Sequence, residues 1–189
     1  QYMKVNSVRM TGQWRDVADA ARTTVGKEDG TGEVSVSWRK RMLLAEHSPI
    51  RLIHFSWKWS RIKYWVSVHL VRHWLGIVHF VTTSRSDRTG IPRDKLPQDT
   101  PVDHRSDANV QALINISRRR LCFQASPETR EAWLAVVNAV GEKDPVIKSV
   151  LVPDCIYRGG ICREMVCCGW VHTEEAKKMM DEYNDTYKV

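Results

Sequence analysis

The sequence has no run of about 18 consecutive apolar residues, the length that a membrane-spanning helix needs. Its most apolar stretch, residues 74–81, is interrupted by His79. The first 15 residues also lack the apolar segment and the small-residue cleavage site of a signal peptide. We therefore expect no membrane partner, and a cytoplasmic location is the simplest reading.

Cysteine, proline and glycine are scarce, with 5, 7 and 10 residues in a chain of 189. These numbers exclude disulfide-rich secreted scaffolds and collagen-like chains. With 42% hydrophobic residues, a chain of this length buries enough surface to fold without disulfides. We expect one domain over residues 1–189, in which residues 150–189 form a cysteine-containing C-terminal extension whose role the sequence does not define.

Several motifs of common enzyme classes are missing as well. The chain contains no G-x-G-x-x-G after a strand, no P-loop sequence, no H-E-x-x-H and no G-x-S-x-G. Rossmann dehydrogenase, P-loop, zincin and esterase mechanisms therefore have no support.

Positive charge is in surplus, with 29 basic against 22 acidic residues and a net charge of +7. A surplus of this size usually reflects only a well-solvated surface. The basic residues are dispersed along the chain rather than gathered in a tail, which suits binding of phosphorylated small molecules or a folded nucleic-acid face better than a disordered arm.

Hydrophobic periodicity predicts a mixed α/β (α+β) fold, with a modest mixed sheet flanked by helices. Apolar residues alternate over residues 51–59, which predicts a strand. Glycine-rich residues 26–32 and the polar residues 84–104 are expected to be loops. The predicted helices cover residues 61–74, 109–123, a segment from a Ser126 cap to a stop at Gly141, and a last segment that starts at Thr173 and buries Met179, Met180, Tyr183 and Tyr187.

Four cysteines and a histidine lie close together near the C-terminus: Cys155, Cys162, Cys167, Cys168 and His172. Their spacing is irregular for a zinc site, which usually has two tight pairs. We expect reduced, packed thiols and no metal in the functional site, and the sequence leaves zinc binding open. Cys122 is expected to pack as a small apolar residue.

Two polar groups are candidates for chemistry. A histidine beside an acid, as in Glu46-His47, can act as a base or as an orienting group, although most such pairs are structural. The triplet Arg118-Arg119-Arg120 lies on a predicted helix. Because successive helical residues are rotated by about 100°, at most one or two of these arginines can face one site.

In combination, these segments resemble the flavin-dependent thymidylate synthase (ThyX-type) family. The resemblance covers roughly residues 1–135 and follows the family's order of motifs. Its pieces are Ala20-Ala21-Arg22, Glu46-His47, the aromatic strand, Arg72-His73-Trp74 in place of the family's R-H-R, and the helix that carries Asn109, Asn115 and Arg120.

The resemblance implies a ThyX-like domain and a set of site residues. Arg120 would be the catalytic arginine that hydrogen-bonds the uracil of dUMP. The residues implied to bind FAD are His47, Arg72, His73, Trp74, Asn109, Gln111 and Asn115. Those implied to bind dUMP are His69, Arg72, Thr83, Ser84, Arg85 and Arg120, with Thr83-Ser84-Arg85 supplied by a neighbouring subunit.

The activity implied is methyl transfer to dUMP to give dTMP, with methylenetetrahydrofolate as carbon donor, FAD as cofactor and NADPH as reductant, in a homotetramer. The chain departs from the family at Trp74, where an arginine is expected, and at Val81, where the family has an acid or amide. We therefore keep two alternatives. One is a flavin enzyme acting on another pyrimidine nucleotide, and the other is a non-catalytic nucleotide-binding or nucleic-acid-binding protein, although nucleic acid is not the expected partner.

Overall fold

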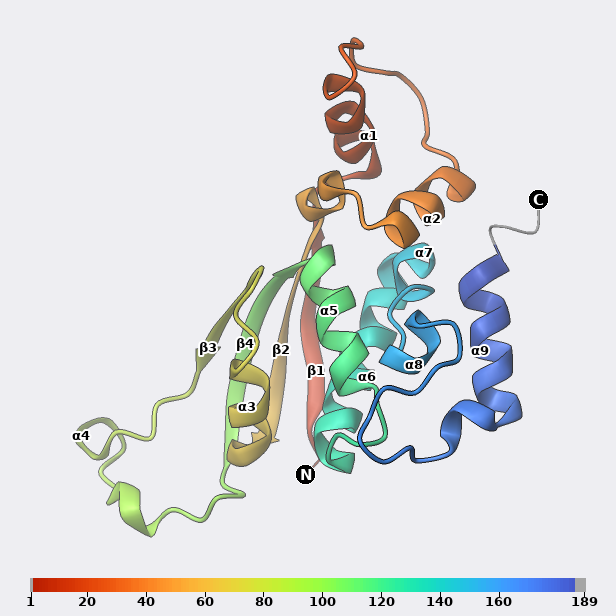
Figure 1. Cartoon of the computed structure of the whole chain (residues 1–189). Helices are drawn as coiled ribbons and strands as arrows, with labels where there is room; N and C mark the ends of the chain where they lie inside the picture. The colour runs from red at the N-terminus through yellow and green to blue at the C-terminus, as the bar shows by residue number, and fades with distance from the viewer. Residues whose placement is uncertain (1, 186–189) are drawn as a thin grey trace.

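The computed structural model describes residues 2–185 of the chain. Four strands form one sheet in the order β1-β2-β4-β3 (Figure 1). Their bounds are β1 (Lys4–Thr11), β2 (His54–Lys63), β3 (Ile77–Val81) and β4 (Pro101–Asn109). The mixed α/β fold class is confirmed, but the sheet is not mixed, because all three strand pairings are antiparallel.

Most of the helices follow the fourth strand and lie on one side of the sheet, whereas α1 and α2, which follow the first strand, lie beyond one end of it (Figure 1). They are α1 (Trp14–Thr23), α2 (Val36–Ala45), α3 (Tyr64–Val71), α4 (Ser86–Thr89), α5 (Val110–Arg120), α6 (Pro127–Lys143), α7 (Pro145–Lys148), α8 (Asp154–Tyr157) and α9 (Glu174–Asn184). Short 3-10 turns occupy η1 (Ser48–Leu52), η2 (Arg93–Lys95) and η3 (Trp170–His172).

Strand β2 supplies the centre of the core. Phe55, Trp57 and Trp59 alternate along it and are all buried. The rings of Trp57 and Trp59 meet edge to face with centroids 5.3 Å apart, and Trp133 from α6 packs 5.9 Å from Trp57. The predicted apolar face of this strand is therefore confirmed, although Arg51 lies outside it, exposed in η1.

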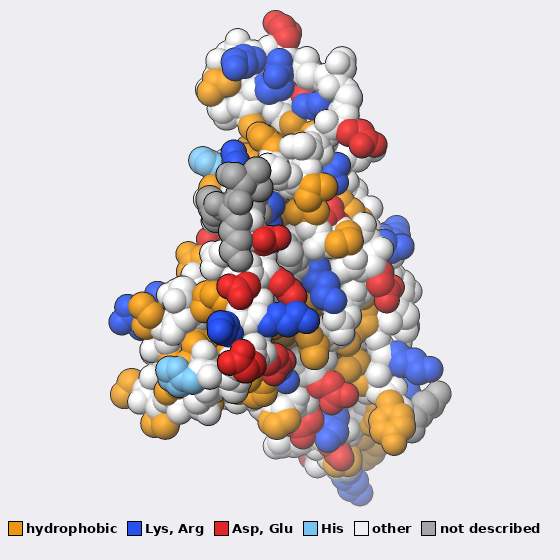
Figure 2. All heavy atoms as spheres, turned by 90° about the vertical axis from the view of Figure 1, so that its right-hand side faces the viewer, with side chains coloured by type: hydrophobic (Ala, Val, Ile, Leu, Met, Phe, Trp, Pro, Cys, Tyr) orange, Lys and Arg blue, Asp and Glu red, His pale blue; other side chains and the backbone are white. Residues whose placement is uncertain are grey.

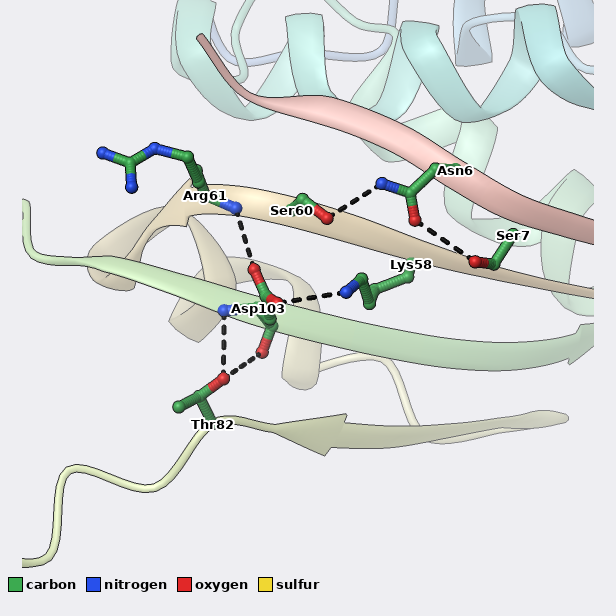
Figure 3. A network of polar contacts seen from close by, with 7 residues as sticks. All are labelled: Asn6, Ser7, Lys58, Ser60, Arg61, Thr82 and Asp103. Carbon is green, nitrogen blue, oxygen red and sulfur yellow. Dashed lines mark hydrogen bonds and ion pairs between the residues drawn. The ribbon is translucent and has the colours of Figure 1, made fainter. Parts of the chain in front are cut away.

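The opposite face of β2 is polar, and hydrogen bonds of polar side chains connect the neighbouring strands there (Figure 3). Asp103 on β4 accepts hydrogen bonds from Lys58 Nζ and from the backbone N–H of Arg61, both at 3.1 Å. The hydrogen bond from the Arg61 backbone is the main cause that lowers the pKa of the Asp103 carboxyl, and the hydrogen bond from Lys58 lowers it further. The Thr82 hydroxyl bonds to the Asp103 backbone at 3.1 and 3.2 Å, so one residue links three neighbouring strands.

Three predicted helices have wrong bounds, one of which is the helix expected over residues 109–123, since α5 ends at Arg120. β2 continues to Lys63 because Arg61 adopts a positive φ of 60° and makes a bulge, which returns the buried Ile62 to the core. α3 is therefore shorter than residues 61–74. At the third boundary, α6 runs past Gly141 to Lys143, since Gly141 keeps a helical backbone and serves instead as a small residue beneath the side chain of Lys148.

The predicted loop over residues 84–104 is correct only to Thr100. That part carries α4 and η2 and projects from the sheet as an arm (Figure 1). The last four residues of the predicted loop, 101–104, begin β4 instead. Along this strand the inward-facing residues are Val102, His104, Ser106 and Ala108. Two of these four inward residues are polar, so hydrophobicity alone does not reveal this strand.

The C-terminal part packs as a smaller cluster around Val152, Ile156 and Ala176. The Thr173 cap of α9 is confirmed, since its side chain accepts from the backbone N–H of Ala176. Met179, Met180 and Tyr183 are half-buried rather than buried, and Tyr187 lies outside the described residues. Among residues 2–185, no helix is both long enough and apolar enough to cross a membrane.

Candidate functional site

Helix α5 positions the central residues of the site. Asn109 caps its first turn by accepting from the backbone N–H of Ala112 at 2.9 Å. The periodicity of the predicted helix places Val110, Leu113, Ile114, Ser117 and Leu121 on one side, and all five are buried. The outward face is therefore left to polar residues and to the three arginines at its C-terminal end.

Arg120 is held rigidly at two points. Its Nε donates to Nε2 of His73 at 2.8 Å, and its Nη2 donates to the backbone carbonyl of His69 at 2.8 Å. The His69 ring is itself fixed by the hydroxyl of Thr129 at 3.0 Å. No described residue accepts a hydrogen bond from Nη1 of Arg120, so this edge of the guanidinium is available to a ligand.

His73 is neutral in this arrangement. Burial lowers its pKa to about 4, with further contributions from Arg120, His79 and Arg72. Because Nε2 accepts from Arg120, the ring proton lies on Nδ1. Burial is also the main cause that lowers the pKa of Arg120, and the nearby positive charge of Arg72 lowers it further. A guanidinium nevertheless remains charged at any physiological pH.

A chain of hydrogen bonds connects His73 to the sheet core. His79 Nε2 lies 2.7 Å from the His73 carbonyl oxygen, and its Nδ1 lies 2.9 Å from Nε2 of His104. Nδ1 of His104 is 2.9 Å from the Ser67 hydroxyl. Burial is the main cause that lowers the pKa of both rings, that of His104 to about 3. Because the carbonyl can only accept, the neutral His79 ring donates to it from Nε2 and accepts at Nδ1, where both His104 Nε2 and the Ser106 hydroxyl, at 2.8 Å, are within reach.

His79 and His104 were not among the residues expected from the sequence. Each lies in a strand that the periodicity did not reveal, and neither forms a motif with its neighbours in sequence. The inward alternation along β4 is the one sequence signal that could have pointed to His104.

The segment after α3 runs beside α5 (Figure 1). At one end His73 contacts Arg120. At the other end the backbone N–H of Asn109 donates to the carbonyl of Gly76 at 2.9 Å. Arg72, next to His73, is exposed, and between the two contacts the indole of Trp74 is 73% exposed. Of the residues predicted for the site, Arg72 and His73 therefore lie near Arg120, whereas Asn109 lies at the opposite end of α5.

A second polar group lies on the outer face of α5 and centres on Glu46. Gln111 donates to Glu46 Oε1 at 2.6 Å and to Asn115 Oδ1 at 3.1 Å, and Arg118 forms an ion pair with Glu46. Glu46 occupies the left-handed position that ends α2, with φ 52°. The acid therefore pairs with α5 rather than with His47, which is exposed.

The three arginines of α5 point to different partners, as their spacing predicts. Arg118 packs 3.4 Å from the ring centre of Tyr157, whereas Arg119 is 64% exposed and pairs with Glu164 at 3.8 Å. Only Arg120 reaches the group around His73.

The single chain does not bring Thr83, Ser84 and Arg85 to Arg120. They lie where the arm leaves β3, and α4 beyond them is far from α5 (Figure 1). Arg85 donates to both carboxylate oxygens of Asp87 at 3.0 and 2.7 Å. These three residues could take part in such a site only through a second subunit.

Comparison with known proteins identifies the fold. No protein-family model matches the chain, and no curated protein matches it. The crystal structure of the UMP/dUMP methylase PolB from Streptomyces cacaoi bound with 5-Br dUMP superposes with a TM-score of 0.65 and 14% identity, over 79% of this chain and 94% of that chain. The form bound with 5-Br UMP gives a TM-score of 0.62 at 14% identity, over 79% and 93% of the two chains.

The chain has the fold of these structures. The predicted ThyX-like fold class is therefore confirmed. At this level of identity the likeness concerns the fold alone, and the roles of individual residues are argued from the geometry.

Proposed function

We propose that the chain is an enzyme that modifies a pyrimidine nucleotide at C5 of the base, with Arg120 as the catalytic residue. The observation that carries the proposal is the fixed guanidinium of Arg120, bound at Nε and Nη2 and free at Nη1. A half-buried, permanently charged donor held in this way is ready to hydrogen-bond a ring oxygen or nitrogen.

The chemistry of C5 alkylation explains the choice of residue. C5 of uracil attacks the carbon unit as a nucleophile, and the activated ring that does so carries negative charge spread over O4, C5 and N3. A guanidinium that is already positioned stabilises this charge without reorganising during the reaction. His73 and the His69 carbonyl supply the positioning, because they fix the plane of the guanidinium.

The specific reaction that we propose is conversion of dUMP to dTMP, with methylenetetrahydrofolate as carbon donor and NADPH as reductant. Two lines of support are the resemblance to the ThyX-type family and the shared fold with a UMP/dUMP methylase that was solved with brominated UMP and dUMP. The chain departs from the family pattern at Trp74, so UMP and other pyrimidine nucleotides belong in the substrate test.

FAD is the cofactor that we propose, and when bound it would supply hydride transfer. The residues beside Arg120 suit a planar, electron-rich ring, since an exposed indole at Trp74 can stack and the Arg72 guanidinium can donate. His73 presents a neutral Nδ1–H. Asn109, Gln111, Asn115 and His47 lie farther along α5 and around Glu46, where they would contact the rest of the dinucleotide.

A second subunit would complete the site. The face beside Arg72 and Trp74 is open to solvent, and Arg85 lies on a projecting arm. In a homotetramer the arm of one subunit would bring Thr83, Ser84 and Arg85 to the phosphate of a nucleotide bound at Arg120 of another. Light scattering should therefore give a tetramer, and a monomer at working concentration would contradict this part of the proposal.

The test of the function is spectroscopic and chemical. The purified chain should show flavin absorbance that changes when dUMP is added. With FAD, NADPH and methylenetetrahydrofolate it should convert dUMP to a product with the mass of dTMP. A different stable product would assign another pyrimidine modification, whereas a protein that binds neither flavin nor nucleotide would refute the proposal.

Non-catalytic binding of nucleic acid is less well supported. Base stacking on exposed aromatic residues would be needed. Trp74 and Phe80 are exposed, but the core tryptophans Trp57, Trp59 and Trp133 are each at most 1% exposed. On the face shown in Figure 2, acidic and basic side chains are interspersed rather than separated by sign, unlike the basic stripe typical of nucleic-acid binding. A DNA affinity that falls steeply with salt, in a protein without flavin, would favour this alternative.

A further inference from the structure

All five cysteines of the chain line one small cavity beside the C-terminal end of α5. The cavity measures about 20 Å³, roughly the space of one water-sized particle. Three separate segments supply the thiols, and none is in a disulfide. Cys122 follows α5, Cys155 lies in α8, and Cys162, Cys167 and Cys168 lie on the irregular segment of residues 158–169.

The thiols act on one another electrostatically. Burial raises the pKa of Cys155 to about 11, with further contributions from Cys122 and Cys162. Burial also raises the pKa of Cys122, to which Glu164, Cys168 and Cys162 contribute. The cavity is lined by these thiols together with Arg163, Glu164 and Asp154.

One backbone amide points at a sulfur atom of the cluster. The N–H of Gly169 donates to Cys167 Sγ at 3.4 Å. A neutral thiol is a weak acceptor and a thiolate is a strong one. Hydrogen bonds of this kind orient the ligands in metal sites.

We propose that this cysteine cluster binds zinc, with Cys122, Cys155, Cys162 and one of the adjacent pair Cys167 and Cys168 as ligands. Zn²⁺ takes four thiolates in a tetrahedron with Zn–S distances of about 2.3 Å. Binding exchanges four protons for one ion: Zn²⁺ and four Cys–SH give Zn(S–Cys)₄ with charge 2−, and four H⁺ pass to solvent. No electron transfer is involved.

In this proposal the cysteine side chains move closer together when the ion binds. In the part of the chain that the structure describes, no three Cys, His, Asp or Glu side chains are grouped closely enough to hold a metal. Residues 158–169 contain no helix or strand, and Gly159, Gly160 and Gly169 all have positive φ. Such a segment can move its thiols inward, and metal binding commonly supplies the free energy for local ordering.

Zinc would fix this segment against the end of α5. The present contacts there are side-chain contacts near the surface. Arg119 pairs with Glu164 at 3.8 Å, Gln124 donates to the carbonyl of Val166 at 2.8 Å, and the rings of Phe123 and Trp170 lie 5.4 Å apart. The site would thus stabilise the region after Arg120 without touching substrate, and the proposal does not depend on the proposed enzymatic function.

The experiment measures metal in the full chain, expressed with added zinc and purified without chelators. We expect about one zinc per chain, and thiolate-to-metal charge-transfer absorption after replacement by Co²⁺. Cys122→Ser, Cys155→Ser and Cys162→Ser should each lower the zinc content at least about tenfold. At least one of the matched single variants Cys167→Ser and Cys168→Ser should retain the metal.

Thiol reactivity in the wild-type chain provides a second measurement that does not require a variant to fold. Alkylation of four cysteines should be at least about tenfold slower until a chelator is added. A metal-free protein whose five thiols react freely would overturn the proposal. So would disulfides, which tryptic mapping would reveal, since cleavage after Arg158 and Arg163 separates Cys155, Cys162 and the adjacent pair into different peptides.

Discussion

Arg120 and His73 are joined by a hydrogen bond of 2.8 Å in which the guanidinium donates and the imidazole accepts. A protonated His73 would have no lone pair at Nε2, so this contact and a charged imidazole exclude one another. Burial, which lowers the pKa of His73 to about 4, keeps the ring in the accepting form at neutral pH. The orientation of Arg120 therefore depends on a histidine that stays neutral.

Replacing Arg120 tests the role of its guanidinium. Arg120→Ala should lower kcat for dUMP about 10²–10³-fold or more, the range for loss of one preorganised donor, while FAD stays bound. Arg120→Lys should recover little, because the single nitrogen of an ammonium cannot reproduce the planar fork that bonds His73 from Nε and the His69 carbonyl from Nη2 while presenting Nη1 to a ligand. Steady-state kinetics and flavin fluorescence measure the two effects. Arg119→Ala, at an exposed position, is the matched control, and substantial turnover by Arg120→Ala would contradict the mechanism.

Replacing His79 tests whether the histidine chain positions Arg120. His79→Phe removes the donor to the His73 carbonyl, and we expect the Kd for dUMP to rise about tenfold, which corresponds to one lost hydrogen bond. A glutamine amide can donate from a similar position, so His79→Gln should restore most of the affinity. Titration calorimetry measures the Kd, and melting curves show whether the fold is intact. Equal affinity in the Phe and Gln variants would show that the chain has no positioning role.

The buried His104 makes stability depend on pH. Its pKa is lowered to about 3 in the folded protein, against about 6.5 in an unfolded chain. As pH falls below 6.5, the unfolded chain takes up a proton and the folded chain does not, so the free energy of unfolding falls until about pH 3. For this residue the loss between pH 7 and pH 5 should be about 2 kcal/mol, with His73 acting in the same direction.

Urea unfolding at the two pH values measures this loss. The loss should be about 2 kcal/mol smaller in His104→Gln and unchanged in His172→Gln, since His172 is exposed. An NMR titration of the His104 ring in the wild-type chain gives the same information if the variant does not fold. A ring that titrates near pH 6.5 would refute the prediction.

The sequence predicted best the elements whose signals are local. The Ser126 and Thr173 caps, the inward stripe of α5 and the aromatic face of β2 all follow from residue type and spacing within a few positions. The end of β2 could not be predicted in this way, because the bulge at Arg61 depends on the pairing with β4. β4 itself was hidden by His104 and Ser106, which face inward although they are polar.

The roles of the expected site residues stay predictions, but the sequence correctly placed Arg72 and His73 near Arg120. The surrounding partners come from tertiary contacts: Glu46 turns to Arg118 because α2 ends beside α5, and His79 meets His104 because β3 pairs with β4. No spacing along the chain encodes either contact. The gathering of all five cysteines was likewise not predictable from their irregular intervals.

Gly76 offers a test of how tightly the segment after α3 is held against α5. Its φ is 72°, and an added Cβ would lie 2.8 Å from Nδ2 of Asn109, the residue that caps α5. Gly26 is a matched control, with φ 69° and open space around its Cβ position. Gly26→Ala should cost about 1 kcal/mol from the left-handed backbone alone. Gly76→Ala should cost about 2–3 kcal/mol, because the Asn109 cap must also shift.

Urea unfolding of the two variants measures the difference, and equal costs would show that the contact with Asn109 is not tight. The double variant Gly76→Ala with Asn109→Ala separates the two causes. Because the second substitution removes both the clash and the cap, the combined cost should fall short of the sum of the single costs by about 1 kcal/mol. Additive costs would mean that the alanine at position 76 strains only its own backbone, and that α5 and the segment carrying His73 are positioned independently.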